Sequence, residues 1–234
     1  MEAIVLALQN YGERLYKTFI ATGYYKMLIE GLLNTVLITL GALVIGVLIG
    51  TLIAFLKYLS EDAPALKAVS GLCDAYVTAI RGIPVVVLLL IFYFVIMRTT
   101  TNGVLVAVIT FGINSGAYMA ELIRSGINAV DGGQTEAGRC LGLSKSQTMF
   151  KIILPQAVRY VLPAMGNEFI ALLKETSVAG YVAVVDLTRA GNLVRNNTHD
   201  AINPLMVVAL TYLVMVIVFT ALLHKLEQAL AQKK

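Results

Sequence analysis

Hydrophobic residues follow one another along this chain in long runs, with few of the polar interruptions that amphipathic helices and strands show. The two longest runs cover residues 27–56 and 204–223. Each can cross the hydrocarbon core of a bilayer as a helix, which takes about 20 mostly apolar residues. A third run, residues 103–120, has a similar length and contains Asn114 and Tyr118. These runs predict three membrane-spanning helices.

A fourth span is predicted around Pro84. The apolar run 83–97 is short, but it continues backward through Arg81 and Gly82 into the more amphipathic residues 65–80. Proline removes a backbone donor and clashes with the preceding turn, so it bends a helix that contains it. We expect one long helix that is kinked near Pro84 and crosses the membrane once.

The fifth predicted span, residues 162–185, carries charge at membrane depth. Glu168, Lys174 and Glu175 lie in its middle, where a lipid-facing helix would not carry them. This span must therefore face protein or water. Together the five spans predict an all-α, polytopic membrane protein in which residues 1–234 form a single transmembrane domain.

Composition supports the membrane assignment. Hydrophobic residues make up 58% of the 234 residues and charged residues 14%, whereas soluble domains have about 45 to 50% and about 25%. Cys73 and Cys140 form no C-x-x-C pair, and His199 and His224 are the only histidines, so we expect no metal or cofactor on this chain. The apolar stretch 3–8 is shorter than a signal-peptide core, so the first span should remain in the mature protein.

The distribution of lysine and arginine predicts the orientation, because cytoplasmic loops are enriched in both. A cytoplasmic C-terminus leaves Arg81 and Lys174 unassigned and puts six basic residues outside: Arg14, Lys17, Lys26, Arg98, Arg189 and Arg195. It puts ten inside: Lys57, Lys67, Arg124, Arg139, Lys145, Lys151, Arg159, Lys225, Lys233 and Lys234. We therefore predict the N-terminus outside and residues 124–159 in the cytoplasm.

The predicted cytoplasmic segment 124–159 contains the capping and termination signals of ordered helices. Asp131 can cap a helix that begins at residue 132 or 133, and Gly142 can end it in the left-handed conformation. Ser144 and Gln147 form a capping box for a second helix. Pro155 disfavours helical geometry at the residue before it, so the second helix should end or bend there. We predict two short helices joined by residues 142–144.

Three roles are open to this segment on spacing alone. A DNA-binding helix-turn-helix is disfavoured, because the segment lies between membrane spans and lacks a recognition helix rich in Arg and Asn. It could pack on the bilayer surface as a simple connection. It could also dock a soluble partner.

A motif in this segment favours docking. Glu136, Ala137 and Gly138, then Gly142, then residues 152–155 (IILP) match the pattern E-A-A-x3-G-x9-I-x-L-P. This resembles the coupling loop of bacterial ATP-binding-cassette importer permeases. The third position is Gly138 where that family more often has alanine, which could loosen the first helix by about 0.5 to 1 kcal/mol.

Three further blocks resemble the polar amino acid branch of these permeases. Residues 81–84 (RGIP) look like its R-G-x-P, and residues 114–121 with Arg124 look like its N-x-x-A-Y-x-A-E-x-x-R. Residues 174–177 (KETS) look like its K-[DE]-T-S. All the blocks occur in the family's order and cover most of the chain.

The resemblance implies that the loop sits in a cleft of a cytoplasmic ATPase dimer and moves when ATP drives the dimer closed. The residues that match or join this motif are Glu136, Ala137, Gly138, Gly142, Leu143, Ile152, Leu154 and Pro155. This chain has no G-x-x-x-x-G-K-[ST] run, so ATP and Mg²⁺ are expected on the partner ATPase. The implied partners also include a second permease subunit, identical or related, and an extracytoplasmic amino acid binding protein.

Polar groups at or near membrane depth are the candidates for a substrate pathway. They are Asn114, Tyr118, Glu121, Glu168, Lys174, Glu175, Thr176 and Ser177. The first three share one helix face. The structural alternatives are that Glu121 or Glu168 pairs with Arg124 or Lys174, that Tyr118 packs, that Arg81 reaches the interface, and that Thr176 and Ser177 bond their own helix. A helix break at Thr176 and Ser177 is slightly favoured.

Two G-x-x-x-G spacings, Gly46 with Gly50 and Gly112 with Gly116, predict close packing between membrane helices. The main functional hypothesis is a bacterial inner-membrane subunit that forms half of the pathway of an ATP-driven importer for a polar or basic amino acid. The alternatives are a secondary transporter or channel that needs no ATPase, and a structural membrane adaptor. We expect no binding to nucleic acid.

Overall fold

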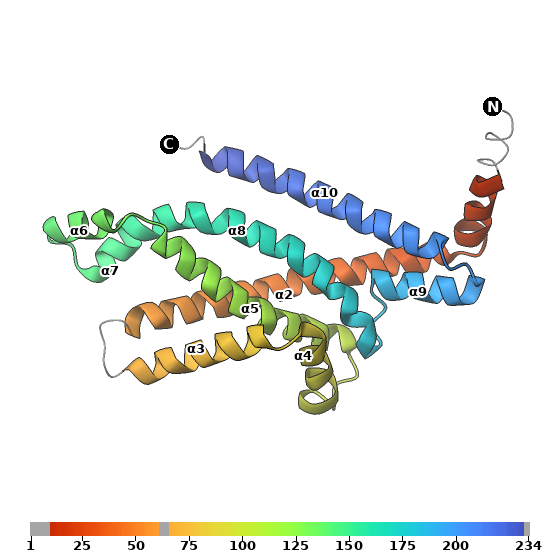
Figure 1. Ribbon diagram of the computed structural model, residues 1–234, viewed down its shortest axis with the longest axis horizontal. Coiled ribbons are helices and arrows are strands. Elements are labelled where there is room, and N and C mark those ends of the chain that lie inside the picture. Colours follow the sequence, from red (N-terminus) through yellow and green to blue (C-terminus); the bar gives the residue numbers. More distant parts are fainter. Residues whose placement is uncertain (1–9, 61–65, 232–234) are drawn as a thin grey trace.

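The computed structural model of the protein describes residues 10–60 and 66–231, and within these ranges it is helical with no strand. The longest helices are α2 (Tyr24–Ser60), α5 (Gly103–Asn128), α8 (Leu154–Glu175) and α10 (Asn203–Ala231), which extend along the long axis of the molecule (Figure 1). The all-α prediction is confirmed. The apolar stretch 3–8 and the terminal Lys233 and Lys234 lie outside the described residues.

Three helices, α2, α5 and α10, are long and apolar enough to cross a membrane alone. The pair formed by α3 (Lys67–Gly82) with α4 (Val85–Ile91) and the π-helix η3 (Phe92–Ile96) makes up to one more span. The structure thus supports three to four of the five predicted spans by length and composition. The fifth predicted span, residues 162–185, begins within α8. Helix α8 is not apolar enough to count as a membrane span, because its charged residues lower its mean hydropathy.

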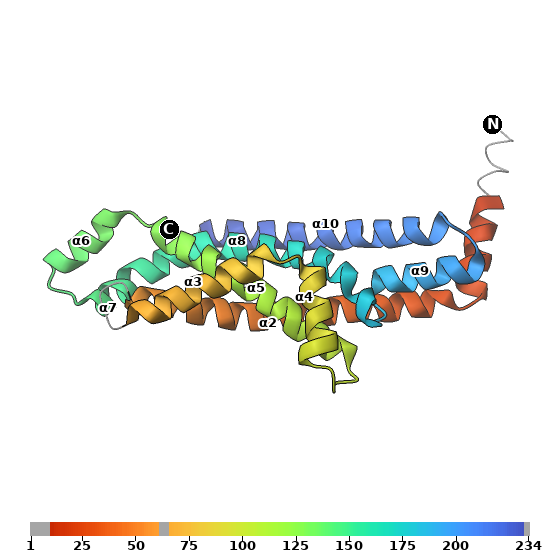
Figure 2. The ribbon, with the colours of Figure 1, turned by 60° about the horizontal axis from the view of Figure 1, so that its bottom comes forward.

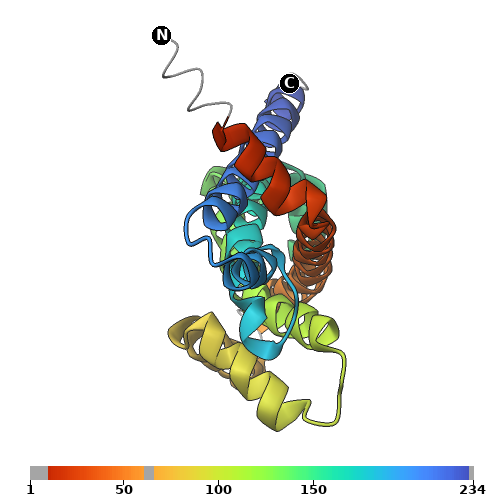
Figure 3. The same ribbon diagram turned by 90° about the vertical axis from the view of Figure 1, so that its right-hand side faces the viewer.

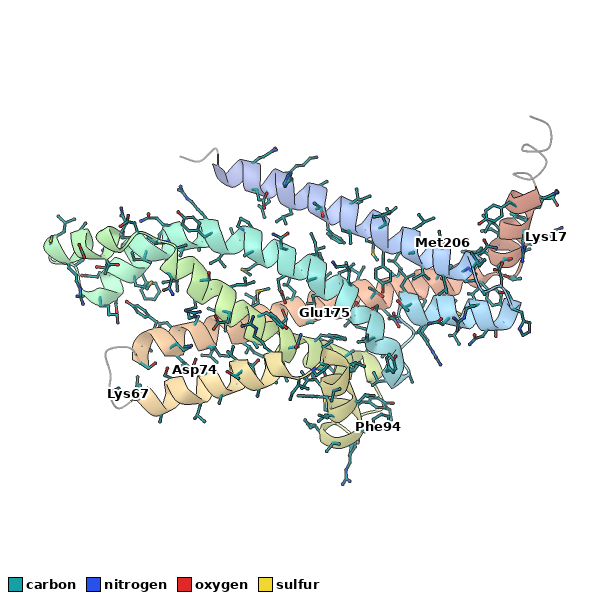
Figure 4. All side chains as sticks on the ribbon, in the orientation of Figure 1. Lys17, Lys67, Asp74, Phe94, Glu175 and Met206 are labelled. Carbon is teal, nitrogen blue, oxygen red and sulfur yellow. The ribbon has the colours of Figure 1, made fainter. Side chains whose placement is uncertain are left out.

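The helix predicted to kink near Pro84 is broken there. Ile83 has extended backbone angles (φ −100°, ψ 130°), and α3 and the following helix meet at 105°. The residue before a proline is driven toward the extended region, so the hydrogen-bond ladder stops. Phe94 lies at the tip of the arm formed by α4 and η3, which stands out from the bundle (Figure 4). This arm and α10 lie on opposite sides of the bundle (Figure 3).

Helices α2 and α5 form the centre of the bundle, and glycines set their separation. A Cβ added at Gly50 would lie 2.5 Å from the Cβ of Met119 and 2.8 Å from the backbone nitrogen of Ala120. In the opposite direction, a Cβ at Gly116 would lie 2.8 Å from Ile49. Gly46 and Gly112 make equivalent close approaches to Ser115 and Ile45. The predicted close packing at both G-x-x-x-G spacings is confirmed.

A buried apolar cluster lies next to this contact and joins five elements. Ile38 of α2, Leu89 of α4, Phe111 of α5 and Leu172 of α8 are fully buried together. They are joined by Ala179 of the 3-10 helix η5 (Thr176–Val182). The cluster places α5 and the end of α8 side by side, which positions the polar groups of the candidate pathway.

The end of the bundle opposite the loop 124–159 is held by polar contacts around α9 (Leu187–Thr198). The amide of Asn34 donates to the carbonyl of Val185 at 2.9 Å, and the backbone N–H of Leu187 donates to the Thr35 hydroxyl at 3.1 Å. Near the π-helix η1 (Tyr16–Ala21), the Tyr11 hydroxyl donates to Asn203 at 2.6 Å. These bonds anchor α9 and the first helical turns to the ends of α2 and α10.

Candidate functional site

The loop 124–159 projects from one end of the bundle (Figure 2) and is folded by local caps. Helix α6 (Gly132–Cys140) begins at Asp131, whose carboxylate accepts the Gly133 N–H at 2.7 Å. Gly142 has φ +76°, and Ser144 and Gln147 form the complete capping box of α7 (Lys145–Thr148). The predicted cap, turn and capping box are all confirmed. A rigid two-helix element therefore leaves the membrane domain.

The prediction that the second helix ends or bends at Pro155 is wrong. Helix α7 passes into the π-helix η4 (Met149–Ile153), and Leu154 keeps right-handed helical angles (φ −58°, ψ −43°) as α8 begins. The wider π turn closes with a bond from the Leu154 N–H to the Met149 carbonyl. Proline is tolerated in the first turn of α8, where its missing donor is least needed. The loop is thus one rigid continuation of α8.

The residues of the motif fall on different sides of the loop. Glu136, Ala137 and Gly142 are exposed, as is Pro155, whereas Gly138 is buried. Leu143, Ile152 and Leu154 are partly buried. Next to Gly142, Leu141 leaves 78% of its surface exposed. This apolar side chain at the tip of the loop is accessible to a partner, and the sequence reasoning did not single it out.

Gly138 is the point where α6 packs on the next helix. A Cβ at this position would lie 2.7 Å from Cγ2 and 2.9 Å from Oγ1 of Thr148, and 3.2 Å from Ile152. The Thr148 hydroxyl is buried without a hydrogen-bond partner among the described residues. The glycine that departs from the family pattern therefore makes room for a threonine on α7. The expected loosening of α6 is offset by a closer contact.

Gly138→Ala should therefore destabilise the loop although alanine is the better helix former. Overpacking of a tight contact costs about 1 to 3 kcal/mol, which exceeds the roughly 0.5 to 1 kcal/mol gained in helix propensity. Adding Thr148→Ala should restore stability, because it removes both clashing atoms. Proteolysis rates of the loop in the single and double variants measure this. A single variant as resistant as the wild type would show that the contact relaxes freely.

The loop is also braced against the membrane helices. The Gln156 amide donates to the Ile152 carbonyl at 2.9 Å and to the Gln134 side chain of α6 at 3.3 Å. Below it, α5 and α8 approach closely, since a Cβ at Gly126 would clash with the Val161 side chain. Helix α6 is therefore in contact with the start of α8, and α8 in turn packs against α5.

The candidate pathway residues of α5 have different surroundings. Asn114 is buried, and its amide donates to the Glu175 carboxylate of α8 at 3.5 Å. The guanidinium of Arg81 lies 4.9 Å from the centre of the Tyr118 ring. Glu121 forms an ion pair with Arg124 one turn away at 2.7 Å. The structural alternative considered for Glu121 is thus present, while Asn114 and Glu175 meet across two helices.

On α8, Glu168 is partly buried and forms no ion pair with any described residue, whereas Lys174 is exposed. Helix α8 ends at Glu175 in the centre of the molecule (Figure 4), and the chain continues as η5. At Thr176 and Ser177 the α-helix changes to a 3-10 helix, so the regular α-helix ends where the break was predicted, but the chain stays helical to Val182. Thr176 also donates to the Leu173 carbonyl at 2.8 Å.

The break borders two cavities, of about 440 and 300 Å³, that Ser177 lines in common. The first extends to Asp186 at the start of α9, whose carboxylate accepts the Thr188 N–H at 2.9 Å and the Arg189 N–H at 3.3 Å. Irregular backbone at membrane depth occurs where it is buried in protein or lines a cavity. The α8–η5 junction is such a place.

A family model described as "Binding-protein-dependent transport system inner membrane component" matches residues 46–232. The chain belongs to this family. It is 34% identical over 208 residues to "Putative glutamine transport system permease protein GlnP" of Rickettsia bellii, covering 87% of this chain and 92% of that protein. "Probable glutamine ABC transporter permease protein GlnM" of Bacillus subtilis is also 34% identical, covering 88% and 94%.

Among solved structures, one described as "Crystal structure of an amino acid ABC transporter with histidines" is similar, with a TM-score of 0.81 and 37% identity. The match covers 89% of this chain and 96% of that one. The chain is thus a permease subunit of the amino acid ABC transporter family, as the sequence motifs indicated. Its apolar helices are those of a multi-pass inner-membrane protein.

Sequence reasoning on the permease missed the contacts between helices. It gave Arg81 at the membrane interface as an alternative and did not foresee that the Arg81 guanidinium lies over the Tyr118 ring. It gave no role to Thr148, which determines why Gly138 is needed. Neither contact has a local sequence signal, because each joins residues of different helices.

Proposed function

We propose that this permease is the membrane subunit of an ATP-driven importer for a polar amino acid, and that it forms half of the translocation pathway. The folded loop 131–155 supports this most directly. Its exposed Glu136, Ala137 and Leu141 form a docking surface on a rigid extension of α8. A closing ATPase dimer that moved this surface would reorient α5 and α8, which is the motion that alternating access requires.

The proposed orientation follows from charge and shape. The loop and the end of α10 lie toward one end of the long axis, and η1 and α9 lie toward the other (Figure 1). We assign the loop and the C-terminus to the cytoplasm, because this places the larger number of basic residues inside. The opposite end would then receive substrate from an extracytoplasmic binding protein. A second permease subunit, identical or related, would complete the pathway.

The polar junction of α5 and α8 is the proposed substrate pathway. Asn114 and Glu175 offer an amide and a carboxylate in a largely apolar interior, and Glu168 adds a second carboxylate without an ion-pair partner among the described residues. Such groups can bind the amino or side-chain nitrogen of a polar amino acid. The relatives named for glutamine transport support this substrate class.

Glu175→Gln should lower the initial rate of amino acid uptake by about tenfold or more, because a hydrogen bond to a charged group contributes about 1.5 to 3 kcal/mol. Lys225→Gln on α10 is the control, since Lys225 is exposed and lies outside the α5–α8 junction. Uptake of labelled glutamine, arginine and histidine by cells that express each variant measures the effect. Uptake by the Glu175 variant that equals that of the wild type and of the Lys225 variant would remove Glu175 from the pathway.

The proposed assembly is tested by copurification from the native membrane. A tagged chain should recover a P-loop ATPase whose hydrolysis is stimulated by substrate and its binding protein, and mass spectrometry would identify the second permease. A chain that purifies alone and supports ion-driven flux in liposomes would instead establish the secondary transporter.

A further inference from the structure

A cavity of about 390 Å³ lies where the end of α2, the first half of α3 and the end of α5 meet. It is separate from the α5–α8 junction and from the exposed docking surface of the loop. Its lining is polar on one side and includes Lys57, Ser60, Lys67, Ser70, Asp74 and Arg124. The cavity thus gathers three cations and one carboxylate from three helices.

The charges leave the cavity suited to an anion. Lys57 of α2 is paired with Asp74 of α3, and Arg124 is paired with Glu121, which lies outside the lining. Lys67 has no acidic partner among residues 10–60 and 66–231. Lys67 and Asp74 lie on the same helix, with Lys67 at its first turn (Figure 4). Among the residues that the structure describes, one cation therefore remains for a ligand.

The start of α3 also favours an anion in the cavity. Its N-cap, Leu66, has no side chain that can accept a hydrogen bond, and the first turn contains no acidic residue. The N-terminal N–H groups of a helix and its dipole attract anions. A lysine at this end is unfavourable for the isolated helix, so Lys67 and the helix start together favour a negatively charged group in the cavity.

The depth of the cavity indicates what carries that charge. The apolar run of α2 ends at Leu56, directly before Lys57, so the cavity lies where hydrocarbon gives way to lipid headgroups. Apolar side chains on the same turns are exposed, with 45% of Phe55, 41% of Leu59 and 71% of Leu72 accessible. A ligand that fits both the cationic lining and the exposed apolar side chains has a phosphate group and acyl chains.

We propose that this cavity binds the headgroup phosphate of an anionic phospholipid. Basic sites between transmembrane helices on the cytoplasmic side are suited to such headgroups. Tyr58 lines this cavity and also a neighbouring one of about 460 Å³ beneath the loop, which Gly132 and Thr148 line. A bound headgroup would therefore touch the wall that supports α6 and α7. The assignment to the cytoplasmic leaflet rests on the proposed orientation, whereas the site itself does not.

Gly71 allows a test that leaves the cations in place. It lines the cavity, and a Cβ added there meets no atom within 4 Å. Gly71→Glu and Gly71→Gln therefore introduce side chains of equal size, one of which repels a phosphate. Lys67→Gln removes one cation, and Lys225→Gln on α10 is its control outside the cavity.

The experiment measures phosphatidylglycerol retained by the full chain, in the assembly that copurifies with it, by native mass spectrometry in detergent. Lys67→Gln should reduce retention roughly fivefold, the effect of about 1 kcal/mol per cation near a lipid surface. Gly71→Glu should reduce it more than Gly71→Gln, and Lys225→Gln should retain wild-type amounts. Phosphatidylcholine should be retained weakly by every variant.

Glycerol phosphate, added as a competitor, distinguishes binding of a lipid headgroup from binding of a soluble phosphate ester. We expect it to displace the lipid only at far higher concentration, since it lacks acyl chains. Displacement at equal concentration would assign the site to a soluble phosphate and overturn the lipid proposal. Equal retention of phosphatidylglycerol by the wild type, Lys67→Gln and Gly71→Glu would overturn the site altogether. Both results are independent of transport activity, so they do not depend on the proposed function.

Discussion

Gly142→Val is expected to lower amino acid uptake by about 5- to 30-fold while the protein still assembles in the membrane. Gly142 has φ +76° at the turn between α6 and α7. An L-residue there costs about 1 to 2 kcal/mol, and more if it is β-branched. An energy of this size changes the population ratio of two loop conformations by about 5- to 30-fold. The strain falls on the turn that presents Leu141 and Glu136 to the proposed ATPase.

The matched control is Gly142→Asn, because asparagine adopts the left-handed conformation at low cost. It should retain most of the uptake and most of the substrate-stimulated ATP hydrolysis. Both variants should appear in the membrane at wild-type amounts, since Gly142 is exposed and no atom lies within 4 Å of an added Cβ. Wild-type uptake by Gly142→Val would show that the geometry of this turn does not contribute to coupling.

Gly50→Ala is expected to cause the largest loss of stability among small substitutions. The added methyl group would lie 2.5 Å from Met119 Cβ and 2.8 Å from the backbone nitrogen of Ala120. Backbone cannot rotate away as a side chain can, so α2 and α5 must separate. Overpacking of this kind costs about 1 to 3 kcal/mol, and the separation would also disturb the buried cluster around Ile38 and Phe111.

Gly71→Ala on α3 is the comparison for this variant, because nothing lies within 4 Å of its added Cβ. It should be neutral or stabilising by about 0.5 to 1 kcal/mol. Thermal unfolding of the purified chain in detergent should therefore give a lower midpoint for Gly50→Ala and an equal or higher one for Gly71→Ala. If both variants unfold at the same temperature, the close approach of α2 and α5 is not required for stability.

The parts of the permease that the sequence predicted well are those held by local interactions. The Asp131 cap, the left-handed Gly142 and the Ser144 capping box each involve residues within a few positions of one another. The G-x-x-x-G spacings worked for a related reason, since small residues on one helix face allow close packing whatever the partner is.

The parts that it could not predict depend on contacts between distant residues. Pro155 gave a correct signal for a local disturbance, but a π turn absorbs it and the helix continues into α8. At Pro84 a kink was expected, whereas the full break and its angle of 105° depend on how α4 packs against the rest of the bundle. The meeting of Asn114 and Glu175 requires the register between α5 and α8. No spacing within one segment encodes that register.

The charges of α8 explain why five spans remained a prediction. Glu168, Lys174 and Glu175 lower the hydropathy of this helix, so length and composition alone do not identify it as a span. Its position is consistent with a helix that lines a pathway and is shielded from lipid by its neighbours. A second permease subunit would cover more of its surface.

ATP-driven uptake by purified protein tests the central claim most directly. The tagged chain, its copurifying ATPase and the binding protein would be placed in liposomes, and accumulation of labelled glutamine, arginine and histidine would be followed with ATP on the loop side. We predict accumulation of at least one of these amino acids that requires ATP hydrolysis, is lowered by about 5- to 30-fold in Gly142→Val and is mostly kept in Gly142→Asn. Accumulation that proceeds equally well without ATP would contradict the account.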